Sequence, residues 1–441
     1  MRGVRSTLRA CGFGVTIAVA GAALAACGSS DDSGAGGKTE ISYLVVAREG
    51  SKAGAQAEID AFEKANPDII VKLDTFPEGA DGDNLVKTKL STGEMDEVFN
   101  YNAGALFRAL QPDNQLTDLS GEAWAADLPD SYKKVVSTDK GMYGAPLGQS
   151  SGGGVLYNRK VYDQLKLSVP TTWSEFIANG QKIKAAEPDI TPVLQAYGDA
   201  WTAQVPVLAD FANVTKQDPA WAQGWTAGQK KFGQSPALTA FTHLEQLGKS
   251  GLVNKDYASM TNIQALKALA DGKGAQYPMI SDQLPTIAQD SPDAVDDIGF
   301  FALPADDAAN TTATIWQPGG LYIPRSAEGD KLEAAKKFVA FVSSSEQGCQ
   351  IQSDTGVAIG AFVSPVCKQP SDVSQAVKDV QKYLDDGQVA PALEFLSEVK
   401  GPNLDKITVQ VGSGITSGAQ GAKQYDDDAR KQAQQLGLSG W

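Results

Sequence analysis

The chain has 441 residues, of which 42% are hydrophobic, and a formal net charge of −15. A protein this acidic repels nucleic acid and anionic lipid surfaces, so neither is expected as a partner. The sequence contains one histidine, His243, which argues against a Ser-His-Asp or Cys-His hydrolase and against a zinc site. The length exceeds what one hydrophobic core usually serves and therefore predicts two lobes.

The first 26 residues have the features of an export signal. Three arginines within the first nine residues precede an apolar stretch over 11–23, which is too short to span a membrane. A Leu-Ala-Ala-Cys run then ends at Cys27 and looks like a bacterial lipobox, in which the Cys27 thiol would carry lipid and become the mature N-terminus. The alternative is an ordinary secretory signal with an incidental cysteine. We expect a protein outside the cytoplasm, lipid-anchored to the cell membrane.

Residues 27–38 are expected to form a flexible tether after the signal. From Gly28 to Lys38 the chain consists mainly of Gly, Ser and Asp, and Ala35 is the largest apolar side chain in this stretch. Such a segment cannot build a core and behaves as a flexible linker.

Two cysteines remain for the folded body, Cys349 and Cys367, which lie 18 residues apart. In an oxidising compartment they are expected to pair, and closing that loop would stabilise the fold by about 3 kcal/mol. The alternative is a pair of buried free thiols.

The first part of the body alternates strands and helices. Strands are expected over 41–46, 69–73 and 97–100, and helices over 53–66, 84–92 and 103–110. This alternation predicts a parallel sheet covered by helices, with ligands at the carboxyl ends of its strands. That rule selects the polar residues after the first strand, Arg48 and Glu49, and those around the end of the third, Asn100, Tyr101 and Asn102.

A second α/β region follows. A strand is expected over 155–158, and a helix should begin at Thr172, because Glu175 three residues later completes a capping box. A further helix is indicated around 332–342 by apolar residues at helical spacing.

Six short motifs stand in order along the chain: Gly141–Pro146, Leu156–Lys160, Pro170–Glu175, Gly272–Ala275, Phe301–Pro304, and Gly319-Gly320 leading into Ile323-Pro324. Together they resemble the carbohydrate-type solute-binding proteins of ABC importers, extracellular solute-binding protein family 1, a group that includes maltose-binding protein. Each motif is weak alone, but their order behind a lipobox is specific. The resemblance extends from about Glu40 to the end of the chain.

The resemblance implies an α/β, two-lobed periplasmic-binding-protein-like fold of type II, in which each lobe is a sheet flanked by helices. The implied first lobe comprises 39–145 and 283–320, and the second comprises 146–282 and 321–441. Crossings between the lobes would lie near Pro146-Leu147, Ser281-Asp282 and Leu321-Tyr322. Chains that cross repeatedly restrain shear and permit hinge closure around a ligand.

The implied function is capture of a carbohydrate in the cleft between the lobes, and its delivery to the permease subunits of an ABC transporter. The resemblance implies a monomer that is not an enzyme and needs no cofactor. One alternative is a non-sugar polar solute such as a polyol or a glycerol phosphate. A phosphate group would require clustered basic residues, and only Arg48 lies near the expected cleft. Another alternative for the function is a lipid-anchored glycoside hydrolase that uses two carboxylates, such as Glu49 and Asp199. A third is an adhesin or structural lipoprotein, which would bind no small ligand.

Sugars offer C–H faces that pack on aromatic rings and hydroxyls that need fixed polar partners. Arg48 and Glu49 fit this need, although an exposed surface pair is an equal alternative. At least one ligand contact is expected among Asn100, Tyr101 and Asn102, with helix capping by an asparagine as the alternative.

Seven other positions complete the expected site. Gln149 follows the first crossing, with a polar loop as its alternative. Asp199 and Trp201 lie where relatives offer an aromatic ring, and a core position for the tryptophan is equally open. Trp316 is the strongest candidate for a stacking platform, because Gly319 and Gly320 follow it and would let the backbone approach a ligand closely. Asp282 stands where many relatives have an aromatic residue, which favours a smaller or more polar ligand than a long maltodextrin.

Overall fold

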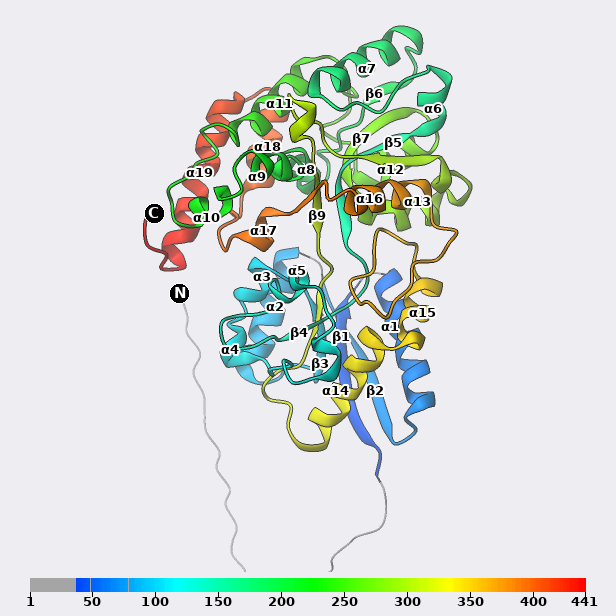
Figure 1. Cartoon of the computed structure of the whole chain (residues 1–441), viewed down its shortest axis with the longest axis vertical. Coiled ribbons are helices and arrows are strands. Elements are labelled where there is room, and N and C mark those ends of the chain that lie inside the picture. Colours follow the sequence, from blue (N-terminus) through cyan, green and yellow to red (C-terminus); the bar gives the residue numbers. More distant parts are fainter. Residues whose placement is uncertain (1–36, 48, 78) are drawn as a thin grey trace, which may run out of the picture. The chain divides into compact units, whose positions relative to one another are not determined.

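The structure is a computed structural model that describes residues 37–47, 49–77 and 79–441, without the side chains of Glu49 and Ala80. The expected signal peptide, Cys27, the tether up to residue 36 and Arg48 lie outside the described residues. The described helices and strands belong to one unit, Lys38–Trp441 (Figure 1). Within the described part of the chain, none of the helices is long and apolar enough to cross a membrane.

One sheet has five strands in the order β2-β1-β3-β10-β4. β1 is parallel to both β2 and β3, whereas β10 runs antiparallel to β3 and β4. The strands are β1 (Thr39–Val46), β2 (Ile69–Phe76), β3 (Val98–Tyr101), β4 (Gly144–Pro146) and β10 (Gly320–Tyr322). The helices packed with this sheet are α1 (Glu49–Ala65), α2 (Gly79–Thr92), α3 (Ala105–Arg108), α4 (Pro112–Gln115), η1 (Ala123–Ala125), α5 (Asp130–Lys133), α14 (Gly329–Ser344) and α15 (Glu346–Thr355). The expected parallel arrangement of the first three strands is confirmed.

The core of this sheet forms where α1 and α14 cover β1. The ring of Phe338 lies edge-on to Phe62 and to Tyr43, at centroid distances of 5.1 Å in each case. All three side chains are buried. Leu44 and Val45, which follow Tyr43 in β1, are buried as well, so both faces of this strand are covered and it carries consecutive apolar residues.

The other sheet has six strands in the order β11-β9-β5-β7-β6, and β8 also pairs with β5. The strands are β5 (Ser151–Asn158), β6 (Thr191–Val193), β7 (Gly274–Ile280), β8 (Ile298–Phe301), β9 (Ala313–Trp316) and β11 (Val389–Pro391). The helices that follow these strands are α6 (Arg159–Gln164), α7 (Trp173–Ala186), η2 (Ala200–Gln204), α8 (Val205–Ala209), α9 (Phe211–Gln217), α10 (Trp221–Thr226), α11 (Leu238–Lys249), α12 (Asn262–Ala270), η3 (Ser281–Gln283), α13 (Leu284–Asp290), η4 (Pro292–Asp297), η5 (Ala308–Asn310), α16 (Gln375–Asp385), α17 (Leu393–Leu396), α18 (Leu404–Gly412) and α19 (Gly418–Gln435). α7 begins with the expected capping box, in which the Thr172 and Glu175 side chains each accept from the other's backbone N–H.

We call residues 38–146 and 320–355 the first lobe, and residues 151–316 and 375–441 the second lobe, because each set packs mainly around its own sheet. The second lobe has an additional aromatic core between α10 and α19, in which Trp221 and Trp225 stack at 5.4 Å. The chain changes sheet at 147–150, at 317–319 and at 356–374. These three segments are the crossings between the lobes.

This division differs from the expected one at two segments. Residues 283–320 were assigned to the first lobe, but β8 and β9 pair with β5 and so belong to the second sheet. Residues from 321 onward were assigned to the second lobe, but β10 and α14 pack in the first core. The chain stays with the second sheet at Ser281-Asp282, where a crossing was expected. The physical reason is that a four-residue apolar strand has no local feature that specifies its partner strand.

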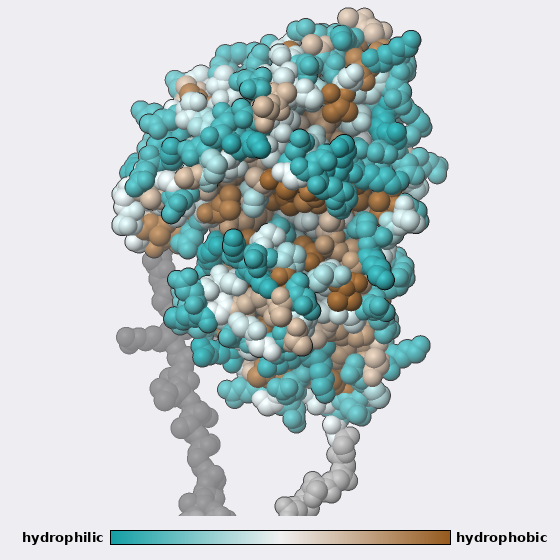
Figure 2. Space-filling model, viewed as in Figure 1, coloured by the Kyte–Doolittle hydropathy of each residue, from teal (hydrophilic) through white to brown (hydrophobic). Residues whose placement is uncertain are grey.

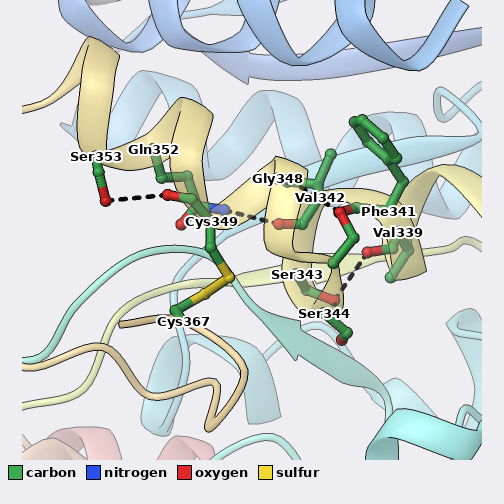
Figure 3. The surroundings of a disulfide bond; sticks show 11 residues. Val339, Phe341, Val342, Ser343, Ser344, Gly348, Cys349, Gln352, Ser353 and Cys367 are labelled. Atoms are coloured by element: carbon green, nitrogen blue, oxygen red, sulfur yellow. Dashed lines mark hydrogen bonds between the residues drawn. A yellow bond between two sulfur atoms is a disulfide. The ribbon is translucent and has the colours of Figure 1, made fainter. Parts of the chain in front are cut away.

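Cys349 and Cys367 form the expected disulfide, with their Cα atoms 5.0 Å apart (Figure 3). Cys349 lies in α15 of the first lobe, and Cys367 lies in the crossing 356–374. The bond therefore attaches this crossing to the first lobe.

Candidate functional site

Four of the expected site residues meet where β3 runs beside β10. The Asn100 side chain donates from Nδ2 to the carbonyl oxygen of Gly320, at 3.2 Å. Gly319 lies so close that a Cβ there would be 2.7 Å from the carbonyl oxygen of Tyr101. A glycine is therefore required at 319 by the contact between these strands. That the two glycines let the backbone approach a ligand stays a prediction.

Tyr101 and Asn102 differ in how they face the surroundings. Tyr101 is buried, and its hydroxyl donates to Oδ1 of Asp83 at 2.9 Å. Burial, together with the Asp83 carboxylate, raises the pKa of this phenol. The Asn102 side chain is exposed, whereas its carbonyl oxygen accepts from the Tyr322 hydroxyl at 3.0 Å. The alternative of an asparagine cap is wrong, because the N-cap of α3 is Gly104.

Trp316 ends β9 opposite Ser151 and packs against the core of the first lobe and the helical core of the second. Its indole covers Gly153, where a Cβ would collide with the ring. The indole Nε1–H donates to Oε1 of Glu394 at 2.8 Å. The tryptophan is half-buried, so its ring is held between the lobes without being sealed in either core.

Glu394 and Arg108 belong to this region, although the sequence analysis did not select them. Oε1 of Glu394 also lies 3.3 Å from Nζ of Lys400, whereas Oε2 is buried with no hydrogen-bond partner among the described residues. Nη1 of Arg108 is likewise buried without a partner there. Burial lowers the pKa of this guanidinium, although Glu398 opposes the shift. Both residues lie on four-residue helices, whose sequences carry no periodic signal that could have identified them.

Gln149 connects two of the crossings. Its Oε1 accepts from the backbone N–H groups of Ile359 at 2.7 Å and Gly360 at 3.2 Å. The next residue, Ser150, donates from both its backbone N–H and its hydroxyl to the carbonyl oxygen of Ala361. The side-chain amide oxygen of Gln149 thus binds the crossing 356–374.

Asp199 and Asp282 are joined by a chain of hydrogen bonds at the carboxyl end of β7. Asp199 Oδ2 accepts from the backbone N–H of Asn262 at 2.7 Å, and the Asn262 amide donates to Gln283 Oε1 at 2.7 Å. Gln283 in turn donates to Asp282 Oδ1 at 2.8 Å. The core position considered for Trp201 is wrong, because this side chain in η2 is 37% exposed.

The remaining expected residues and chemistries add little to this site. Glu49 begins α1, and its side chain lies outside the described residues, as does Arg48. His243 is buried, stacks on Trp173 at 4.0 Å and contacts Asp306 through Nε2 at 2.9 Å. Across the residues that the structure describes, no group of three or more His, Cys, Asp or Glu residues could hold a metal ion.

Comparison with known proteins places this arrangement in a family. Residues 47–348 match the family described as bacterial extracellular solute-binding protein. The "Multiple sugar-binding protein" of Streptococcus mutans is 28% identical over 325 residues, which cover 73% of this chain and 75% of that protein.

Solved structures show the same fold. A "Chitin oligosaccharide binding protein" superposes with a TM-score of 0.76 at 19% identity, covering 90% of this chain and 99% of its own. The solute-binding protein RafE in complex with raffinose gives a TM-score of 0.74 at 19% identity, covering 90% of this chain and all of that one. A binding protein from Bacillus subtilis in an open conformation gives 0.74 at 19% identity, with 92% and 100% coverage. The chain has the type II periplasmic-binding-protein fold and belongs to the bacterial extracellular solute-binding protein family.

Proposed function

We propose that this protein captures a carbohydrate between its two lobes and delivers it to the permease subunits of an ABC importer. The placement of Trp316 carries the proposal. Its half-buried indole lies where the cores of both lobes meet, with the Glu394 carboxylate at its edge. An aromatic face beside fixed polar groups suits a sugar, which has both C–H faces and hydroxyls. The names of the relatives, which include multiple sugars, chitin oligosaccharide and raffinose, support the same ligand class.

The surface of the protein is consistent with a ligand held between the lobes. On the face shown in Figure 2, hydrophobic residues gather near the level where the lobes meet, whereas most of the remaining surface is hydrophilic. Separate cores joined by three crossings allow the lobes to turn as bodies while the connections restrain sliding. Ligand binding would then stabilise a closed arrangement.

The site residues selected from the sequence remain part of this proposal. Asn100, Tyr101, Gly319 and Gly320 would form the first-lobe side of the site, together with the exposed Asn102. Trp316, Asp199, Trp201 and Asp282 would form the second-lobe side, Gln149 would lie at the crossing between them, and Arg48 and Glu49 would flank β1.

The protein is proposed to bind its sugar without altering it. Asp199, one of the two carboxylates considered for hydrolysis, accepts a backbone N–H through Oδ2 at the start of α12, which suits a fixed hydrogen-bond acceptor more than a proton donor. A lipid anchor at Cys27 would keep the monomeric binding protein outside the cytoplasm, close to its permease.

A thermal-shift and calorimetry panel tests the proposal. The panel contains galactose, glucose, raffinose, chitin oligosaccharides and glycerol phosphate. A binding sugar at 100 times its Kd should stabilise the protein by about 2.7 kcal/mol. Stabilisation by glycerol phosphate alone, or by none of the compounds, would contradict sugar capture. Chromatography of the same mixtures after long incubation should return the sugar intact, and cleavage products would show an enzyme.

A further inference from the structure

Two complementary charged atoms at the contact between α3 and α17 lack hydrogen-bond partners among the residues that the structure describes. They are Oε2 of Glu394 and Nη1 of Arg108, both buried and without hydrogen bonds to the described residues. Buried polar atoms are nearly always paired in folded proteins, because an unpaired one keeps its full desolvation cost. An unpaired acceptor and an unpaired donor on facing elements therefore call for a group that can satisfy them.

The two helices bring the lobes together at this point. α3 belongs to the first lobe, and α17 packs Leu393 in the helical core of the second lobe and Phe395 in the core of the first. A Cβ on Gly104, at the start of α3, would lie 2.6 Å from the carbonyl oxygen of Glu394. α17 lies beside α3 at the level where the lobes meet (Figure 1).

The orientation of the Glu394 carboxylate is fixed from one side. Oε1 accepts the indole N–H of Trp316 at 2.8 Å and lies 3.3 Å from the Lys400 ammonium, which offsets part of the negative charge. Only 15% of the Glu394 side chain is exposed. Oε2 is thus a positioned acceptor next to the ring that we propose as the stacking platform.

We propose that Glu394 determines sugar specificity: Oε2 accepts a hydroxyl of the sugar ring that stacks on Trp316, and Arg108 Nη1 donates to an oxygen of the same ligand. This inference rests on the proposed function and assigns two of its ligand contacts. A hydroxyl donates one hydrogen and accepts others, so neighbouring hydroxyls of a neutral sugar satisfy both atoms. The carboxylate disfavours an anionic group at that position.

The test compares Glu394→Gln with Glu40→Gln, a matched control at the start of β1, whose side chain is 50% exposed and pairs with Lys72. Gln at 394 keeps an oxygen for the Trp316 N–H but replaces the charged acceptor. Calorimetry with the tightest-binding sugar of the panel should show about ten-fold weaker binding for Glu394→Gln, because hydrogen bonds to charged groups are the stronger kind. Glu40→Gln should bind within two-fold of the unsubstituted protein, and the melting temperature without sugar should be unchanged in both.

Deoxy analogues of the same sugar separate a ligand contact from a structural role. The unsubstituted protein should lose about ten-fold in affinity for the analogue that lacks the hydroxyl bound by Glu394. Glu394→Gln should lose little further affinity for that analogue, because the interaction is already weakened. Equal affinity of Glu394→Gln and the unsubstituted protein for the sugar would overturn this inference and leave sugar capture intact. If the unsubstituted protein bound no sugar of the panel, both proposals would fall.

Discussion

The disulfide between Cys349 and Cys367 should stabilise the fold by an amount set by the loop that it closes. The bond joins residues 18 positions apart, in α15 and in the crossing 356–374. In the chain-entropy description, a loop of this length contributes about 3 kcal/mol, because the cross-link restricts the unfolded chain. Replacing both cysteines by serine should therefore lower the free energy of unfolding by about that amount.

The loss should appear in both chemical and thermal unfolding. Guanidinium titration of the double serine variant should give a lower midpoint than the oxidised protein, at an equal or steeper slope, because the unfolded chain without the cross-link exposes as much surface or more. A reductant should destabilise the unsubstituted protein and leave the serine variant unaffected. The serine variant with reductant is the control that separates loss of the bond from other effects of the reagent.

Two outcomes would refute this reasoning. A serine variant within about 0.5 kcal/mol of the oxidised protein would mean that the crossing is held equally well by its other contacts. Those contacts include the backbone N–H groups of Ile359 and Gly360, which bind Gln149 Oε1. A loss confined to sugar affinity, with no loss of stability, would mean that the bond sets the position of the crossing instead of restricting the unfolded chain.

Three further predictions follow from the site and the cores. Trp316→Ala should weaken sugar binding by about 2 kcal/mol, roughly 30-fold, through loss of ring contact. If the ring and not its N–H dominates, calorimetry should show less than a three-fold loss of sugar affinity for Trp316→Phe. Gly319→Ala should destabilise the fold by about 1–3 kcal/mol in guanidinium titration, because the added Cβ would lie 2.7 Å from the backbone oxygen of Tyr101; unchanged stability would mean that the strands separate easily there. Burial raises the pKa of Asp210 from 3.8 to about 7, with a contribution from Asp306. The folded state therefore retains a proton that the unfolded state loses, and the stability of the fold should decrease as pH rises from about 4 to 7. Asp210→Asn should flatten that fall in unfolding experiments across this range, and an unchanged pH profile would exclude Asp210 as its source.

The sequence predicted the beginning of the first lobe well, because β1, α1, β2 and α2 are long and alternate locally. β1 and β2 each have eight residues and a helix after them, so both their type and their parallel pairing follow from neighbouring sequence. The second sheet was predicted less well, because short strands such as β8 find their partners through contacts distant in the sequence. The lobe bounds over 283–320 and from 321 onward differ for this reason.

The site shows the same division between local and distant information. Asn100 and Tyr101 were selected by the rule that ligands lie at strand ends, and Gly319 and Gly320 because they follow Trp316. The structure brings all four together. Glu394 was missed because its relation to the Trp316 indole spans 78 residues and depends on how α17 packs. Gln149 was selected as a ligand contact, but only the fold reveals that its oxygen binds a crossing 210 residues away.

The bonds from Gln149 and Ser150 to residues 359–361 have a mechanical consequence. Two stretches of chain fastened side by side resist torsion about their shared direction, while bending across them remains soft. In the proposed closure, the lobes would therefore rotate mainly about one axis instead of reorienting freely on flexible linkers. The lobes of the free protein would therefore have less rotational freedom to lose when a ligand binds. A receptor that is preorganised in this way binds more tightly for the same contacts.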